Sequence, residues 1–316
     1  MNTATIALPE RTRVYTSPIY DSGRWDGFTH KAGDILVCTA PKCGTTWTQM
    51  ICALIVHQSP QLPEPLTRLS RWVERHTEPI EAVDAELRRQ THRRVLKTHT
   101  PLDGLPYFED AAYVVCGRDP RDAFLSMIDH LGNLSDETMA DIAQRAGFPI
   151  EAGLPFPTEP NVLFPMWLTI PNQPWMEDGF MWGSVSYYVR SFWPYRRLPN
   201  VHFLHYADLT ADLDGEMRRL SAFLGVPVNE AVWPSLVEAA SFAAMKESAD
   251  KSAPGAHLGE WRSNEDFFRR ARMGEWRGVL SAEGQGLYDK LSGERLEPAL
   301  KAWLEGGREA VDPSAA

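Results

Sequence analysis

Short apolar runs and helical patterns alternate along much of the chain. Residues 34–39 form a β-prone apolar run between a glycine and a loop rich in Pro, Gly and Thr, and such a run is typical of a buried strand. From residue 45 to residue 57 the apolar positions recur at helical spacing, and Thr45 or Thr46 can cap the start of the helix. The sequence therefore predicts a strand, a loop and a helix in immediate succession.

The same alternation recurs further along the chain. Three more β-prone runs lie at residues 95–97, 111–116 and 201–206. The second run precedes a helix from Pro120 to about residue 130, and the third precedes a helix from about residue 212 to 224 that stops at Gly225. Strands that alternate with helices imply a central, mostly parallel sheet flanked by helices, so we expect an α/β fold.

Two segments break this alternation. Residues from about 131 to 182 combine many prolines with aromatic and methionine side chains, which favours an irregular, apolar cap over another strand and helix. Residues from about 249 to 278 are rich in charge, Gly and Ser, which predicts a mobile segment. We expect a single domain over residues 1–316, although two closely packed lobes would also suit this length.

Composition and charge narrow the class of protein. The net charge of −10 argues against a broad binding surface for DNA, RNA or anionic lipid. No run of roughly 20 apolar residues is present, so we expect no membrane span. The four cysteines have neither metal-site nor disulfide spacing, which favours free thiols and a cytoplasmic location.

The loop between the first strand and the first helix predicts an anion-binding site. Residues 41–46, Pro-Lys-Cys-Gly-Thr-Thr, place successive amides and two hydroxyls at the positive end of the helix dipole. The pattern differs from a Walker loop because Lys42 precedes Gly44, and no Mg²⁺ ligand is recognisable. An ordinary turn before a core helix is the alternative for so short a pattern.

Two further pairs of residues suit chemistry on an anionic donor. Lys97 and His99 end the second strand, at the edge where parallel sheets bind ligands. His99 can act as a base near neutral pH, although a lone histidine there is often structural. Arg118 and Ser126 follow the third strand and can reach one phosphate if Arg118 folds over the helix start. Alternatively, they are an exposed arginine and a serine on a helix surface.

Seven blocks of sequence identify a family. They are TAPKCGTTW (39–47), LKTHTP (96–101), YVVCGRDPRDAFLS (113–126), WGSVSYYVRSFW (182–193), FLHYADL (203–209), ASFAAMK (240–246) and FFRRARMGEW (267–276). In content, order and spacing they resemble the cytosolic sulfotransferases that use 3′-phosphoadenosine-5′-phosphosulfate (PAPS). The resemblance spans residues from about 34 to 276. It implies an aryl or alcohol sulfotransferase with a P-loop-like phosphosulfate-binding loop.

The resemblance implies a role for each matching residue. The loop residues Lys42, Cys43, Gly44, Thr45, Thr46 and Trp47 would hold the 5′-phosphosulfate. The 3′-phosphate would be held by Arg118, Ser126, Arg269, Arg270 and Ala271, with Phe267 and Phe268 in the same block. Adenine would lie against Trp47 and Phe242, with Tyr206 near its edge. Lys97 and His99 would face the acceptor, which Tyr187 or Tyr188 would border. The segment 249–278 would then close over the bound nucleotide.

The implied reaction is direct in-line transfer. His99 would deprotonate the acceptor hydroxyl, whose oxygen attacks sulfur, and adenosine 3′,5′-bisphosphate (PAP) would leave. Lys42 and Lys97 would stabilise charge, with no metal required. The apolar content of residues 131–182 favours a small, fairly apolar phenol or alcohol as acceptor, although core packing can explain it too. A nucleotide kinase-like phosphoryl transferase and a noncatalytic nucleotide-binding module are the alternatives.

The chain departs from the family at a few positions. Ala40, Cys43 and Ala271 stand where tyrosine, serine and glycine are usual, and the Cβ of Ala271 can hinder close approach to the 3′-phosphate. Cys43, at a helix N-terminus beside Lys42, is expected to have a lowered pKa and to react when the cofactor is absent, unless it simply fills a loop position. The family's C-terminal dimer motif is not recognisable, so no oligomeric state is predicted.

Overall fold

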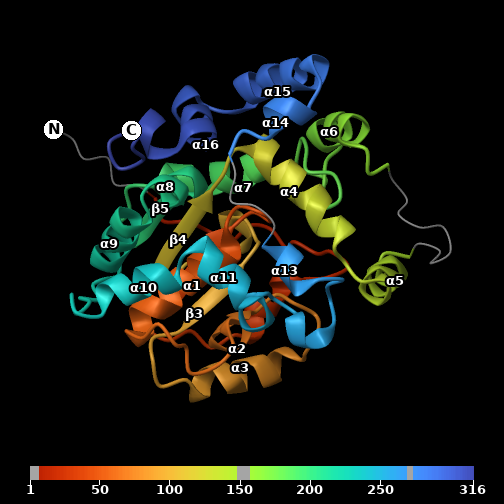
Figure 1. Ribbon diagram of the computed structural model, residues 1–316. Helices are drawn as coiled ribbons and strands as arrows, with labels where there is room; N and C mark the ends of the chain where they lie inside the picture. The colour runs from red at the N-terminus through yellow and green to blue at the C-terminus, as the bar shows by residue number, and fades with distance from the viewer. Residues whose placement is uncertain (1–6, 148–156, 269–272) are drawn as a thin grey trace.

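Five parallel strands form the centre of the computed structural model, which describes residues 7–147, 157–268 and 273–316. Their order across the sheet is β2-β3-β1-β4-β5, and every neighbouring pair is parallel (Figure 1). The strands are β1 (Ile35–Thr39), β2 (Ser70–Trp72), β3 (Val95–Thr98), β4 (Ala112–Gly117) and β5 (Val201–His205). The predicted α/β fold around a parallel sheet is confirmed.

The central strand, β1, is covered on both faces. All of its residues are buried, as are those of β4, because helices lie on both faces of a parallel sheet. Successive side chains point to opposite faces. Leu36 and Cys38 therefore belong to one core cluster, whereas Ile35 and Val37 belong to the other. This two-sided burial explains why the strands read as continuous apolar runs in the sequence.

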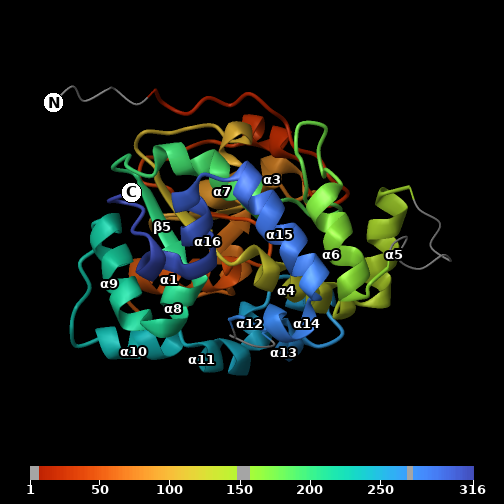
Figure 2. The same cartoon turned by 90° about the horizontal axis from the view of Figure 1, so that it is seen from above.

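Helices form a layer on each side of the sheet (Figure 2). The cluster around Leu36 includes residues from α3 (Ile80–Arg89), α4 (Pro120–Gly132), α6 (Pro160–Thr169), α7 (Val185–Phe192), α14 (Trp276–Val279), α15 (Ala282–Arg295) and α16 (Pro298–Ala310). The cluster around Ile35 is packed against α1 (Thr45–His57), α2 (Leu66–Leu69), α8 (Tyr206–Ala211), α9 (Leu213–Leu224), α10 (Trp233–Ala239), α11 (Phe242–Glu247), α12 (Ala249–Ser252) and α13 (Asn264–Phe267). The short 3₁₀ helices are η1 (Ser22–Gly27), η2 (Leu102–Gly104), η4 (Trp193–Tyr195) and η5 (Ala256–Leu258).

One helix belongs to neither layer. Helix α5 (Asp136–Arg145) has no buried residue and contributes to neither core cluster. It lies at the edge of the molecule in both views (Figures 1 and 2). Its position becomes important for the acceptor.

The segments expected to break the alternation differ in part from their prediction. The stretch 131–182 has no strand in its described part, but it contains α5 and α6, so it is more regular than its prolines indicated. Proline fits α6 because Pro160 lies in the first turn, where its missing amide is tolerated. The stretch 249–278 forms only short helices where it is described. Across the described ranges, no helix is both long and apolar enough to cross a bilayer.

The strand β2 was not predicted. Its three residues, Ser-Arg-Trp, contain no apolar run, and it lies at the edge of the sheet beside β3. An edge strand this short takes its pairing from the tertiary structure, since its own pattern is too short to show a period. The residues that follow it nevertheless prove important for the site.

A buried ion pair fixes the start of two strands that lead to the site. Asp34, which precedes β1, accepts hydrogen bonds from Nε and Nη2 of Arg94, which precedes β3, at 2.7 and 2.5 Å. Both residues are 1% exposed. The pair holds the first residues of β1 and β3 side by side, where Ile35 pairs with Val95.

We expect Asp34→Asn to lower the free energy of unfolding by about 3–5 kcal/mol, because it leaves the Arg94 charge buried without its counterion. Urea denaturation followed by circular dichroism measures the change. Glu230→Gln, which removes the partner of exposed Arg218, is the matched control and should change stability little. Equal effects of the two substitutions would contradict this account of the ion pair.

Candidate active site

The loop between β1 and α1 leaves the first turn of the helix open to a ligand. Gly44 is the N-cap of α1, with φ of 90°, and no side chain caps the helix. The prediction that Thr45 or Thr46 caps it was wrong, because both residues lie inside the helix and the Thr45 hydroxyl lies 2.6 Å from that of Thr39. Uncapped amides at the positive end of a helix dipole are suited to bind an anion.

The backbone of this loop needs a glycine at position 44. A Cβ there would lie 3.1 Å from Cδ2 of Tyr206 and 3.4 Å from Sγ of Cys116, and the positive φ is itself unfavourable for other residues. Lys42 also has a positive φ, 66°, which is uncommon for a side chain of this kind. Such conformations concentrate at functional sites.

Cys43 does not have the character that we expected. Its side chain is 0% exposed and belongs to the core cluster around Leu36. Burial raises the pKa of the Cys43 thiol, and the nearby Cys116 raises it further. The prediction of a reactive thiol is therefore wrong, because the cost of burying a thiolate exceeds the help from the helix dipole and Lys42. All four cysteines are buried free thiols.

A cavity of about 1480 Å³ opens beside the loop. It lies at the carboxyl ends of the strands, where parallel sheets bind their ligands. The predicted site residues on its wall are Lys42, Gly44, Thr45, Thr46, Trp47, Lys97, His99, Arg118, Ser126, Tyr206, Phe242, Phe267 and Phe268. Cys43 does not line it, and Arg269, Arg270 and Ala271 lie outside the described residues.

His99 presents a free nitrogen to this cavity. Its Nδ1 lies 2.7 Å from the carbonyl oxygen of Thr39. Since a carbonyl only accepts, Nδ1 carries the proton and Nε2 keeps its lone pair. Burial, followed by the charge of Lys97, holds the pKa of His99 well below its usual range. His99 is therefore neutral at neutral pH and able to accept a proton at Nε2.

Two lysines beside His99 have weakened charges. Burial lowers the pKa of Lys97 to about 7, with Arg75 adding to the effect. Burial also lowers the pKa of Lys42 to about 8, with Arg118 adding to it. Each ammonium group thus loses its proton as the pH rises through these values. A bound anion favours the charged form, so its binding raises both pKa values and takes up protons above pH 7.

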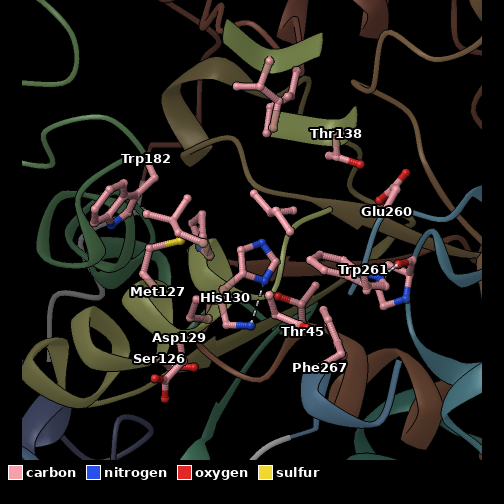
Figure 3. A pocket seen from close by; sticks show the side chains of 18 of the residues that line it. Thr45, Ser126, Met127, Asp129, His130, Thr138, Trp182, Glu260, Trp261 and Phe267 are labelled. Carbon is pink, nitrogen blue, oxygen red and sulfur yellow. Dashed lines mark hydrogen bonds between the residues drawn. The ribbon is translucent and has the colours of Figure 1, made fainter. Parts of the chain in front are cut away.

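The second anion-binding pair lies further along the same wall. Arg118 is 6% exposed, donates from Nη1 to the carbonyl oxygen of Lys42 at 3.0 Å, and places its guanidinium 4.2 Å from the ring centroid of Tyr206. Ser126 lies on the side of α4 that faces the cavity (Figure 3). The rings of Trp47 and Tyr206 meet edge to face with centroids 5.3 Å apart. A phosphate and a flat base can therefore be held side by side.

His130 is a site residue that the sequence analysis missed. Its Nδ1 lies 3.3 Å from Nζ of Lys42, and it lies between Met127 on one side and Trp261 and Phe267 on the other (Figure 3). An ammonium group only donates, so Nδ1 accepts and Nε2 carries the proton, the opposite tautomer from His99. A signal was available, because a residue four positions after Ser126 shares its helix face.

Glu74 is a second missed residue. Its carboxylate is fully buried and accepts hydrogen bonds from Nε1 of Trp25 at 2.8 Å, Nε1 of Trp72 at 2.5 Å, the hydroxyl of Thr98 and the amide of His99 at 3.2 Å. The ring of Trp72 in turn meets the His99 imidazole edge to face, with centroids 5.0 Å apart. No motif around Glu74 indicates this role, which depends on three separate segments meeting.

The cap and the closing segment meet over the cavity. Leu134 and Trp261 form an antiparallel bridge, and the amide of Ser135 donates to the carbonyl of Glu260 at 2.9 Å. The carboxylate of Glu260 also pairs with Arg75, which follows β2. The end of α4 and the described part of the closing segment are thus joined side by side.

The structure does not place Tyr187 and Tyr188 on the cavity wall, which corrects their predicted position. Both belong to α7, on the face of the sheet around Leu36. Tyr188 is 2% exposed within that core cluster, and Tyr187 donates from its hydroxyl to Asp103 at 2.8 Å. The aromatic side chain that does reach the wall from this region is Trp182 (Figure 3).

A metal site is not evident. Within the described ranges, no group of three or more His, Cys, Asp and Glu side chains is arranged to hold a metal ion. The wall instead offers cations and open amides, which bind anions directly.

Comparisons with known proteins agree with this geometry. The sulfotransferase domain model matches residues 32–298. A glycolipid sulfotransferase of Mycobacterium bovis is 37% identical over 95% of this chain and 96% of its own length, and human sulfotransferase 1C2 is 22% identical over 91% of each. Mouse sulfotransferase SULT7A1 in complex with PAP shares the fold, with a TM-score of 0.65 and 20% identity over 88% of this chain and 89% of its own. The chain therefore belongs to the sulfotransferase family.

Proposed function

We propose that this sulfotransferase moves the sulfuryl group of PAPS to a hydroxyl of an amphiphilic, lipid-like acceptor, with His99 as the general base. One observation carries the proposal. The open amides of α1, the cations Lys42 and Arg118, and the free Nε2 of His99 all face one cavity. An anionic donor and a hydroxyl acceptor can therefore meet beside a base.

The donor fits the wall in one direction. The amides at the start of α1, with Lys42, hold the 5′-phosphosulfate, and Arg118 with Ser126 holds the 3′-phosphate. Adenine stacks between Trp47 and Phe242, near Tyr206. Arg269, Arg270 and Ala271 remain predicted ligands of the 3′-phosphate. PAP bound to the mouse relative supports this choice of nucleotide.

The chemistry then follows from the two tautomers and the two lysines. His99 accepts the hydroxyl proton at Nε2 while Thr39 holds Nδ1–H in place. The acceptor oxygen bonds to sulfur as the bond from sulfur to the 5′-phosphate oxygen breaks, and PAP leaves. Lys42 and Lys97 stabilise the charge that moves onto the leaving oxygen. No step in this scheme uses a metal ion.

The acceptor is larger than the small phenol or alcohol that the sequence indicated. The cavity of about 1480 Å³ exceeds the roughly 300–1,000 Å³ of a site for a single drug-sized ligand. It therefore holds the nucleotide together with an extended acceptor. A relative that is 37% identical is a glycolipid sulfotransferase, and a glycolipid combines a hydroxyl-bearing head with an apolar chain. We accordingly place an amphiphile there.

The two alternatives are less well supported. A nucleotide kinase-like enzyme needs a Mg²⁺ site and a Walker lysine after the glycine, whereas Lys42 precedes Gly44 and the family match is to sulfotransferases. A noncatalytic nucleotide-binding module has no use for a base. The orientation of His99, with Nε2 free toward the cavity, favours an enzyme.

The two segments that meet over the cavity close the site in this proposal. Residues 131–182 cover the acceptor, and residues 249–278 close over the nucleotide. Their hydrogen bonds between Ser135 and Glu260 and between Arg262 and Asn133 make them move together. The four buried free thiols suit a reducing cytoplasm, where we place the enzyme.

Replacing His99 by Ala should lower kcat by roughly 10²–10⁴-fold, because it removes the general base. The affinity for PAP should change less than about twofold, since the side chain faces the acceptor. Transfer of ³⁵S from PAPS to 2-naphthol measures kcat, and titration calorimetry measures PAP binding. His57→Ala, away from the cavity wall, is the control. Retained turnover by His99→Ala with any good acceptor would refute the assignment of the base.

Glu74 positions His99 without touching substrate. Its carboxylate binds the His99 amide and the Trp72 ring at once, so it fixes both the backbone and the neighbour of the base. Glu74→Gln places an amide group opposite indole donors and leaves at least one of them unpaired.

We expect Glu74→Gln to lower the free energy of unfolding by about 1–3 kcal/mol. It should also lower kcat by roughly 10–100-fold through displacement of His99, with PAP affinity nearly unchanged. Glu78→Gln, which alters a nearby ion pair with Arg71, serves as the control. A loss of stability with unchanged kcat at a temperature where the variant is folded would show that Glu74 is structural only.

A further inference from the structure

The amphipathic helix α5 turns an apolar stripe toward the cavity. Met139, Ile142, Ala143 and Ala146, its C-cap, recur at intervals of three and four residues, which places them on one helix face. All four line the cavity and are half-buried, although α5 has no fully buried residue. The stripe is thus shielded by the cavity and is not part of a protein core.

The stripe packs against neither core cluster. None of its four residues belongs to either cluster or to the partly buried residues packed on them. Helix α5 itself begins with a Ser135 cap and has acidic residues in its first turn, so its formation needs no further support from packing. An apolar face of this kind is explained by a ligand that covers it.

The opposite wall of this arm of the cavity is apolar too. Met127 and Leu131 of α4, with Met181 and Trp182 before α7, line the same cavity. Met127 is 5% exposed and yet belongs to neither core cluster, and it lies between Trp182 and His130 (Figure 3). The apolar arm is therefore continuous with the part of the cavity that holds His130, Lys42 and His99.

Polar side chains mark the rim of the arm. Asp136, Asp141 and Arg145 reach the cavity from α5 but are exposed, and Asp141 pairs with Arg145 at 2.9 Å. Thr138 is the polar residue of α5 that is half-buried in the wall. The arm thus offers contact area for methylene groups and few groups that could orient a sugar or a peptide.

We propose that this arm, between the stripe on α5 and the wall formed by Met127, Leu131 and Trp182, binds the alkyl chain of the acceptor. The inference rests on the proposed function, which places the acceptor hydroxyl at His99. The stripe extends about 10 Å from Met139 to Ala146 at 1.5 Å per residue. The chain lies along α5 while the head group reaches the base.

A homologous series of n-alkyl β-glucosides, from butyl to octyl, tests the proposal. With ³⁵S-labelled PAPS and the whole protein, KM should fall about two- to fourfold for each added methylene, as expected for burial of CH₂ groups. The variant Ile142→Asn should flatten this dependence, so that KM for the octyl compound rises at least tenfold. Ile142→Leu should keep the dependence, and so should Gln144→Asn on the exposed side of α5.

The acceptor 2-naphthol, which has no alkyl chain, separates the two levels of the argument. It should be sulfated equally by the wild type and by Ile142→Asn, since neither His99 nor the nucleotide site is altered. Turnover of 2-naphthol without a chain-length effect on the glucosides, or with the same effect in Ile142→Asn, would overturn the alkyl-chain site and leave the proposed function standing. If no hydroxyl compound accepts label, the proposed function fails and this inference fails with it.

Discussion

The parallel pairing of β1 with β3 on one side and β4 on the other is the constraint on which the site depends. Parallel strands end at the same edge of a sheet, so the residues that follow them are brought together although they are far apart in sequence. Lys42 follows β1, His99 follows β3 and Arg118 follows β4. The buried pair of Asp34 and Arg94 holds the beginnings of β1 and β3 level, and the register carries that alignment to their ends.

Burial decides the electrostatics of this edge. The protein is acidic as a whole, with a net charge of −10, yet cations gather in the cavity. Burial lowers the pKa of Lys97 to about 7 and that of Lys42 to about 8, and it keeps His99 neutral. The empty site therefore holds cations that are weakened and a base that is ready. An anionic donor restores the lysine charges where they are needed, next to the group that is transferred.

Much of the site could be predicted because it depends on local patterns. Lys42 and His99 end runs that are recognisable as strands, and the order of the motif blocks is specific to one family. Burial could not be predicted in the same way, and Cys43 was misjudged for that reason. Glu74 was missed because its partners come from segments that meet only in the folded chain, and no periodicity records such a meeting. His130 had a detectable signal in its spacing from Ser126.

The cap illustrates a second limit. Its aromatic and methionine content indicated apolar surroundings, but composition alone does not separate core from ligand-binding surface. The structure separates them, because Phe164 is fully buried in a core cluster whereas Ile142 faces the cavity. The size and shape of the acceptor follow from that distinction.

The most direct test is a stoichiometric transfer assay with the purified protein in excess EDTA. We predict that label from ³⁵S-PAPS appears in the sulfate ester of a hydroxyl acceptor, with one equivalent of PAP released for each ester formed. Release of label as inorganic sulfate without an ester, or phosphorylation of the acceptor by ATP once Mg²⁺ is supplied, would contradict a cavity built for sulfuryl transfer.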